Sequence, residues 1–169
     1  VLIDIDPNRA KEQVKSVSEV VREGIQDVRG SLNRLRPGAL EGRTLKDALE
    51  KMIREYQTLS NLQVDLHYEW VDVDMDVMIE DTIFRVIQES MTNAVRHGHA
   101  SQMSLHFFED EEDYLIELQD NGVGFETLTY GYGLKQMMER ISILGGQLQF
   151  ESRDGFFTRV SLPKYKEGR

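Results

Sequence analysis

Between residues 44 and 163 the sequence changes repeatedly between helical and strand periodicity. Apolar residues at helical spacing predict helices starting after Thr44, from about Asp76 to His97, and near Gly133–Leu144. Alternating and β-rich runs predict strands at 63–70, 102–108, 114–119, 147–152 and 157–162. Because helices and hairpin strands come in runs rather than in strict alternation, we expect an α/β (α+β) sandwich, with a mixed sheet and helices packed on one face.

The segment before this region predicts one long amphipathic helix. It begins at Asp6-Pro7, where Asp is a good N-cap and Pro suits the first helical position. Its apolar residues recur at spacings of three and four with one gap: Val14, Val21, Ile25, Val28, Leu32 and Leu35. It ends at Arg36-Pro37-Gly38. The heptad spacing favours part of a helical bundle over a helix folded onto its own domain, so we divide the chain into 1–37 and 38–169.

Composition narrows the classes of partner. A net charge of -10 argues against nucleic acid, because binding of a phosphate backbone needs a clustered basic face. The absence of cysteine excludes a disulfide scaffold, a thiolate metal site and a cysteine nucleophile. No apolar run approaches the ~18 residues of a membrane span, and the start turns polar too soon for a signal peptide. Since the chain does not begin with Met, we expect a piece of a longer protein.

The helix predicted for residues 76–97 carries a polar ridge beside its apolar face. Four polar residues lie four positions apart on it: Arg85, Glu89, Asn93 and His97. Asn93 offers a neutral oxygen suited to Mg²⁺, and Glu89 could polarise a nucleophile or a metal-bound water. Arg96 and His97 place donors at the helix end, where a phosphate tail could lie. Taken alone, this ridge is better interpreted as a solvated surface.

A second element, Asp120-Asn121-Gly122-Val123-Gly124, follows directly on a predicted strand. Two glycines at alternate positions let a backbone pass close to a flat ring. An ionised Asp can accept a hydrogen bond from an exocyclic amine such as that of adenine. A simple turn is an equally good interpretation of this segment alone.

A third element, Gly131-Tyr132-Gly133-Leu134, opens directly into a helix. Backbone N–H groups at a helix N-terminus form an anion site when glycine leaves them accessible, and Lys135 and Arg140 add positive charge. The element lacks the third glycine of a dinucleotide fingerprint and follows a loop rather than a strand, which argues against a Rossmann unit.

In this order and spacing, the three elements resemble the N box and the two glycine boxes of the GHKL superfamily. That superfamily includes histidine kinases, gyrase, MutL-type and chaperone ATPases. The runs 88–97 and 131–140, with Leu35-Arg36-Pro37, resemble more narrowly the sensor histidine kinases that partner NarL/LuxR-type response regulators. The resemblance covers roughly residues 7–163.

The resemblance implies a Bergerat-type site for ATP and Mg²⁺. At its base end, the residues implied to bind adenine or to line it are Asp120, Gly122, Gly124 and Thr158. At its phosphate end, Asn93 would hold Mg²⁺ and Glu89 would be the catalytic acid/base residue. Arg96 and His97 would approach the phosphates, and the lid would contribute Gly131, Gly133 and Leu134.

Two features depart from the family pattern. The closing motif usually reads Gly-x-Gly-Thr, whereas this chain has Gly155-Phe156-Phe157-Thr158, with Phe157 in place of a glycine. The segment between Phe125 and Gly131 is short for a lid. Because of the short lid, we expect modest ATP affinity and an exposed γ-phosphate.

The resemblance also implies what the whole protein does. It would transfer the γ-phosphoryl group of ATP to a histidine and from there to a response-regulator aspartate. None of the four histidines fits the family's acceptor motif, so we expect this piece to bind ATP without phosphorylating itself. We expect a homodimer through the helical bundle and a cytoplasmic domain, anchored in the bacterial inner membrane through other regions. The alternatives are a GHKL ATPase that drives a conformational cycle and a degenerate dimerising module.

Overall fold

The computed structural model describes residues 9, 11, 13, 14, 40, 42–70, 73 and 75–164. The chain divides into two units, Val1–Ala39 and Leu40–Arg169. In the first unit the described residues are helical. Most of the predicted heptad helix, including its apolar positions from 21 to 35 and its predicted end, lies outside the described residues. Every element described below belongs to the second unit.

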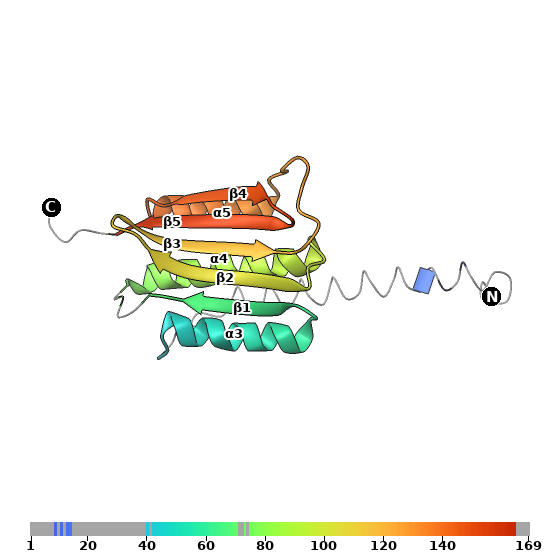
Figure 1. Ribbon diagram of the computed structural model, residues 1–169, viewed down its shortest axis with the longest axis horizontal. Helices are drawn as coiled ribbons and strands as arrows, with labels where there is room; N and C mark the ends of the chain where they lie inside the picture. The colour runs from blue at the N-terminus through green and yellow to red at the C-terminus, as the bar shows by residue number, and fades with distance from the viewer. Residues whose placement is uncertain are drawn as a thin grey trace. The chain divides into compact units, whose positions relative to one another are not determined.

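A five-stranded sheet forms the centre of the second unit, in the order β1-β2-β3-β5-β4 (Figure 1). Its strands are β1 (Gln63–Tyr68), β2 (Gln102–Glu109), β3 (Asp113–Asp120), β4 (Gln147–Ser152) and β5 (Phe156–Pro163). The neighbours β1 and β2 are parallel, and the other neighbouring pairs are antiparallel. The sheet is mixed because a helix connects β1 to β2, whereas β2–β3 and β4–β5 are hairpins.

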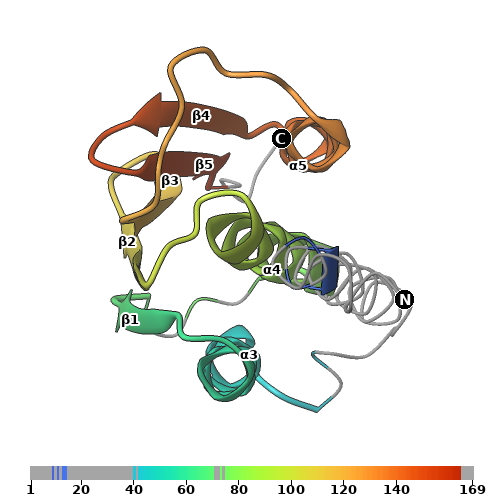
Figure 2. The same cartoon turned by 90° about the vertical axis from the view of Figure 1, so that its right-hand side faces the viewer.

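Three helices of this unit lie on one side of the sheet: α3 (Leu45–Leu59), α4 (Val77–Arg96) and α5 (Tyr132–Ile143) (Figure 2). Side chains cap the first two. Thr44 Oγ1 accepts from the Asp47 N–H at 3.1 Å, and Asp76 Oδ1 accepts from the Met78 N–H at 2.7 Å. The predicted sandwich is confirmed. None of the helices in the described part of the chain is both long and apolar enough to cross a membrane.

The core lies between the sheet and the helices. Strand residues facing the helices are almost inaccessible, among them Leu105, Phe107, Ile116, Leu118 and Val160. Trp70 is also buried, although β1 ends at Tyr68, two residues before the predicted end. Its indole N–H donates to the Phe108 carbonyl at 2.6 Å. Because successive side chains of a strand point to opposite faces of the sheet, the apolar residues at alternate positions all face the helices.

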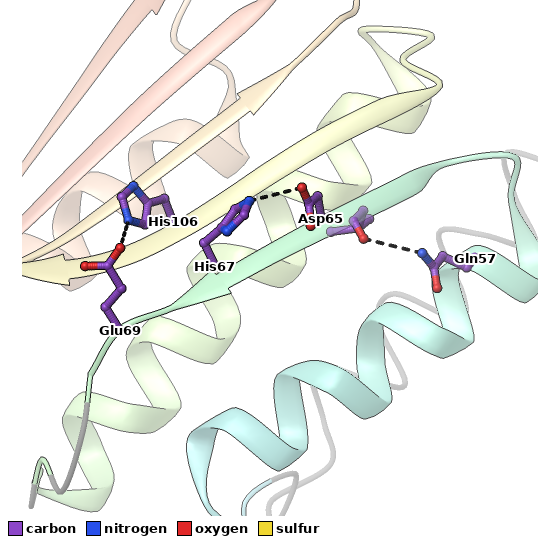
Figure 3. A network of polar contacts seen from close by, with 6 residues as sticks. Gln57, Asp65, His67, Glu69 and His106 are labelled. Carbon is purple, nitrogen blue, oxygen red and sulfur yellow. Dashed lines mark hydrogen bonds and ion pairs between the residues drawn. The ribbon is translucent and has the colours of Figure 1, made fainter.

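The opposite face of β1 and β2 carries polar side chains, among them those that Figure 3 shows. His67 and His106 are register partners on these strands. His67 Nε2 lies 3.0 Å from Asp65, and His106 Nε2 lies 2.8 Å from Glu69. These side chains are exposed, so the pairs add little to stability. Both histidines are strand residues on the surface, as predicted.

Candidate functional site

A cavity of about 440 Å³ lies where α4, the inner face of the sheet and the loop into α5 meet. Helix α4 contributes Glu89, Ser90, Asn93 and His97. The sheet contributes Met103, Leu118, Asp120, Phe156 and Thr158. The loop and the first turns of α5 contribute Gly124, Phe125, Thr127, Leu128, Thr129, Gly131, Tyr132, Gly133, Leu134 and Met137. Three elements that are far apart in the sequence therefore converge on one cavity.

All of the predicted site residues line this cavity except Arg96 and Gly122. Arg96 is half-buried on α4. Lys135 and Arg140, which were expected to add positive charge, do not line the cavity either. Among the described residues that line it, none is Lys or Arg. An anionic ligand would therefore depend on a metal ion and on the N-terminus of α5 for charge compensation.

The positions of apolar and polar residues along α4 explain how this helix contributes both to the core and to the cavity. The side facing the core buries Ile83, Val86, Ile87, Met91 and Ala94. Glu89, Asn93 and His97 are one turn apart on the side that lines the cavity. Ser90 lies between the two sides, and its hydroxyl donates to Met137 Sδ of α5 at 3.8 Å. Three of the four ridge residues therefore line the cavity, whereas the fourth, Arg85, is paired with Asp81 on α4.

Asp120 is the last residue of β3 and is only 6% exposed. Its Oδ1 accepts from two backbone N–H groups, that of Gly122 at 2.8 Å and that of Phe156 at 3.1 Å. Among the described residues, Oδ2 has no hydrogen-bond partner. One oxygen thus fixes the orientation of the carboxylate, and the other can accept from a ligand in the cavity.

Thr158 is 2% exposed and lies beside Leu118 in the register of β5 with β3. Its neighbour Phe157 pairs with Gln119 in a regular strand. The Phe157 ring packs under the Arg153 guanidinium, which is 4.2 Å from the ring centroid. Phe157 in place of the usual glycine therefore leaves the strand path regular, and Thr158 lines the cavity.

Gly122 does not line the cavity, and the reason that this position holds glycine is packing. A Cβ at Gly122 would lie 2.5 Å from the carbonyl oxygen and 2.8 Å from the carbonyl carbon of Gly98. The next residue, Val123, donates its N–H to the same carbonyl at 3.0 Å. Gly122 thus allows the loop after β3 to lie against the turn that follows α4.

Gly124 lines the cavity and has a φ of +59°, which disfavours other residues. A Cβ there would also lie 2.7 Å from the Gly155 carbonyl oxygen. Asn121 anchors the same loop to β2, because its Oδ1 accepts from the N–H groups of Ser101 and Gln102 at 2.9 Å. The Asp-Asn-Gly-Val-Gly element is therefore held in place by contacts with the backbone of other segments, at residues 98, 101, 102 and 155.

One wall of the cavity was not predicted. Phe125 and Phe156 line it with their ring centroids 5.3 Å apart. The row continues from Phe156 to Phe150 at 5.5 Å and from Phe150 to Tyr130 at 6.3 Å. Phe156 lies two residues before Thr158 in the same strand, so both side chains point to the same face of the sheet. This spacing could have identified Phe156 as a residue of the site. The row also connects the short lid to the sheet.

Tyr56 of α3 touches the site helix from outside the cavity. Its hydroxyl lies 2.7 Å from Thr92 Oγ1. Because the Thr92 hydroxyl donates to the Gln88 carbonyl at 2.8 Å, Tyr56 is the donor. Burial raises the pKa of Tyr56 above its ordinary 10.0, and the charge of Glu89 raises it further. Tyr56 is therefore held protonated beside α4.

We expect Tyr56→Phe to lower the free energy of unfolding by about 1 kcal/mol at neutral pH, the usual contribution of one hydrogen bond. The folded protein keeps Tyr56 protonated to a higher pH than the unfolded chain does, so wild-type stability falls as pH rises above 10.0. The variant lacks this loss, and the difference between the two proteins should shrink there. Urea unfolding at neutral and alkaline pH measures both effects; a difference that grows with pH would contradict this assignment.

Residues 78–166 match the family model described as histidine kinase-, DNA gyrase B- and HSP90-like ATPase. Among curated proteins, the chain is 34% identical over 163 residues to the signal transduction histidine-protein kinase/phosphatase UhpB of Salmonella typhimurium, covering 93% of this chain and 32% of that protein. It is 29% identical over 162 residues to the sensor histidine kinase LiaS of Bacillus subtilis, covering 94% of this chain and 44% of that protein. The chain thus spans less than half the length of these relatives.

Solved structures share the fold at lower identity. The histidine kinase AdeS of Acinetobacter baumannii superposes with a TM-score of 0.62 at 17% identity, covering 94% of this chain and 86% of that one. The ATP binding domain of PrrB from Mycobacterium tuberculosis gives 0.59 at 20% identity, covering 71% of this chain and 93% of that one. The match of the family model over more than half of the chain, together with the convergence of its motifs on one cavity, identifies the chain as a member of the histidine kinase-, DNA gyrase B- and HSP90-like ATPase family.

Proposed function

We propose that the chain is the ATP-binding catalytic part of a two-component sensor histidine kinase. The whole protein would transfer the γ-phosphoryl group of ATP to a histidine and then to an aspartate of a response regulator. The observation that carries this proposal is the convergence of the Glu89–Asn93 ridge, Asp120 and the N-terminus of α5 on one cavity. The relatives named as sensor histidine kinases support it.

At the base end, Asp120 Oδ2 would accept from the exocyclic amine of adenine. Oδ1 is already occupied by two backbone donors, so the carboxylate is oriented in advance. Thr158 adds a hydroxyl at the same end, and Gly124 lets the loop approach the ring. Leu118 and Phe156 offer apolar surface to the faces of the base.

At the phosphate end, Asn93 would contribute an oxygen ligand to Mg²⁺. Within the described part of the chain, no three His, Asp or Glu residues are grouped closely enough to hold a metal ion by themselves. A single asparagine oxygen suits Mg²⁺, which binds through few protein ligands and completes its coordination shell with water and substrate phosphates. The bound ion would neutralise phosphate charge, which the cavity lining itself does little to offset.

The remaining groups at this end would orient the phosphates and move a proton. His97 and the backbone of Gly131, Gly133 and Leu134 would contact the phosphate chain, with Gly131 as an N-cap that has no side-chain capping bond. Arg96, which does not line the cavity, would approach the phosphates only after a side-chain movement. Glu89 would accept a proton from the attacking imidazole, which makes that nucleophile stronger.

We extend the proposal to the whole protein. Residues 1–37 would form the second helix of a dimerisation bundle that follows the acceptor histidine, and 38–169 the catalytic domain. The protein would be a homodimer, anchored in the bacterial inner membrane by other regions. Its partner would be a response regulator of the NarL/LuxR type. The heptad spacing supports the bundle, and the sensor kinases among the relatives support the rest.

The test uses the full-length protein with γ-labelled ATP and Mg²⁺. We expect acid-labile phosphohistidine that chases to a response regulator. Asn93→Ala should weaken Mg²⁺-dependent ATP binding at least tenfold, whereas Glu89→Gln should keep ATP affinity within about twofold and slow phosphorylation by about 100-fold, the typical contribution of acid–base catalysis. Steady ATP hydrolysis without phosphohistidine would favour a conformational ATPase. Undetectable nucleotide binding would favour a degenerate module.

A further inference from the structure

The carboxylate of Glu89 lies against the first turn of α5, at Gly133. A Cβ at Gly133 would collide with Glu89 Oε1 and would lie 3.1 Å from Glu89 Cδ. Gly131, the other glycine of the same motif, has no atom within 4 Å of the corresponding position. The two glycines of the Gly-x-Gly element therefore differ: only the second faces the side chain of the proposed catalytic residue.

The backbone does not explain why position 133 is a glycine. Gly133 is the second residue of α5 and is not among the glycines with positive φ in the described part of the chain. An alanine would adopt the same helical conformation more readily than glycine does. What a side chain at this position would meet is the Glu89 carboxylate, with no backbone atom among the nearest contacts. The space beside Gly133 is therefore space that Glu89 uses.

The electrostatics of this contact favour Glu89 in that space. A helix N-terminus carries partial positive charge and attracts a carboxylate. The N-cap of α5 provides no side-chain hydrogen bond that would compete for the N–H groups of the first turn. The neighbouring Ser90–Met137 contact holds the same two helices together. The Glu89 carboxylate therefore lies beside the first turn of α5 as well as on its own helix.

We propose that Gly133 is a positioning residue for Glu89. By carrying no side chain, it leaves the volume in which the Glu89 carboxylate sits at the phosphate end of the cavity. A methyl group at this position displaces the carboxylate to another rotamer and removes the proton acceptor from its working position. This role is separate from a backbone contact of Gly133 with phosphate, and it rests on the proposed function, in which Glu89 accepts a proton.

The experiment compares Gly133→Ala with Gly131→Ala in the full-length protein, each with Glu89 and in the Glu89→Gln background. The rate of phosphohistidine formation is measured at saturating ATP, with the ATP affinity measured separately. We expect Gly133→Ala to slow the reaction at least tenfold when Glu89 is present and less than twofold in the Glu89→Gln background. Whatever the effect of Gly131→Ala, it should be equal in the two backgrounds. Equal losses from Gly133→Ala in both backgrounds would overturn the proposal.

A second measurement does not depend on turnover. The full-length protein is labelled with ¹³C at glutamate carboxyl carbons, and the Glu89 resonance is assigned by its loss in Glu89→Gln. Without nucleotide, Gly133→Ala should shift this resonance and Gly131→Ala should not. An unchanged resonance in Gly133→Ala would overturn the positioning role even where ATP binding and phosphorylation are intact. A failure of ATP binding in the wild type would instead overturn the proposed function, and the resonance still reports on the contact.

Discussion

Asp120→Asn is expected to weaken ATP binding by about 10- to 100-fold while leaving the fold nearly as stable as the wild type. A hydrogen bond to a charged group contributes about 1.5–3 kcal/mol, and each 1.4 kcal/mol is tenfold in affinity. The asparagine oxygen can still accept from the N–H groups of Gly122 and Phe156, which Asp120 Oδ1 now holds. The amide nitrogen then replaces Oδ2 and presents a donor to the adenine amine. Isothermal titration with MgATP, together with urea unfolding, measures both quantities.

Asp120→Ala is the matched comparison. It removes both oxygens, so it should lose ATP binding and also about 1–3 kcal/mol of unfolding free energy, because two backbone donors lose their acceptor. The two variants therefore separate the ligand-binding role of the carboxylate from its role in holding the loop. Wild-type ATP affinity in Asp120→Asn would show that the base is not recognised at this residue.

Gly122→Ala is expected to lower the free energy of unfolding by about 2–3 kcal/mol, a typical cost of overpacking. The added methyl group would meet the backbone of Gly98, with the carbonyl oxygen at 2.5 Å and Cα at 2.8 Å. A backbone cannot move aside as the end of a flexible side chain can, and the Val123–Gly98 hydrogen bond fixes the two segments together. Urea unfolding of the two proteins measures the loss.

Gly131→Ala provides the control for stability. Its φ of -68° and ψ of 178° are accessible to alanine, and nothing lies within 4 Å of the added atom. The unfolding free energy should therefore fall by less than about 1 kcal/mol, the scale of a change at an N-cap. If both glycine variants lose stability equally, the contact with Gly98 is not the cause of the loss in Gly122→Ala.

Much of the fold follows from local patterns. The apolar period predicted the start of α3 and placed both ends of α4 within one residue of its observed bounds, and Thr44 caps α3 as predicted. These features depend on interactions within a few residues, which the sequence displays directly. The end of β1 was less predictable, because Trp70 is buried by packing on Phe107 and Tyr114 rather than by strand pairing.

Residues that line the cavity were predictable where several motifs occur together. Glu89, Asn93 and Asp120 could be identified because each lies in a short pattern, and the order of the patterns led to the family. The structural reason for Gly122 could not be predicted, because it depends on the distant backbone of Gly98. The aromatic row from Phe125 to Tyr130 through β4 and β5 likewise depends on strand register, which no short window of sequence determines.

The most direct test of the account is a crystal structure of the protein with Mg²⁺ and a non-hydrolysable ATP analogue. We expect the exocyclic amine of adenine to lie within hydrogen-bond distance of Asp120 Oδ2. We also expect Asn93 to bind the metal and the phosphates to lie against the first turn of α5. A nucleotide bound outside this cavity, or one bound inside it with its base away from Asp120, would contradict the central claim.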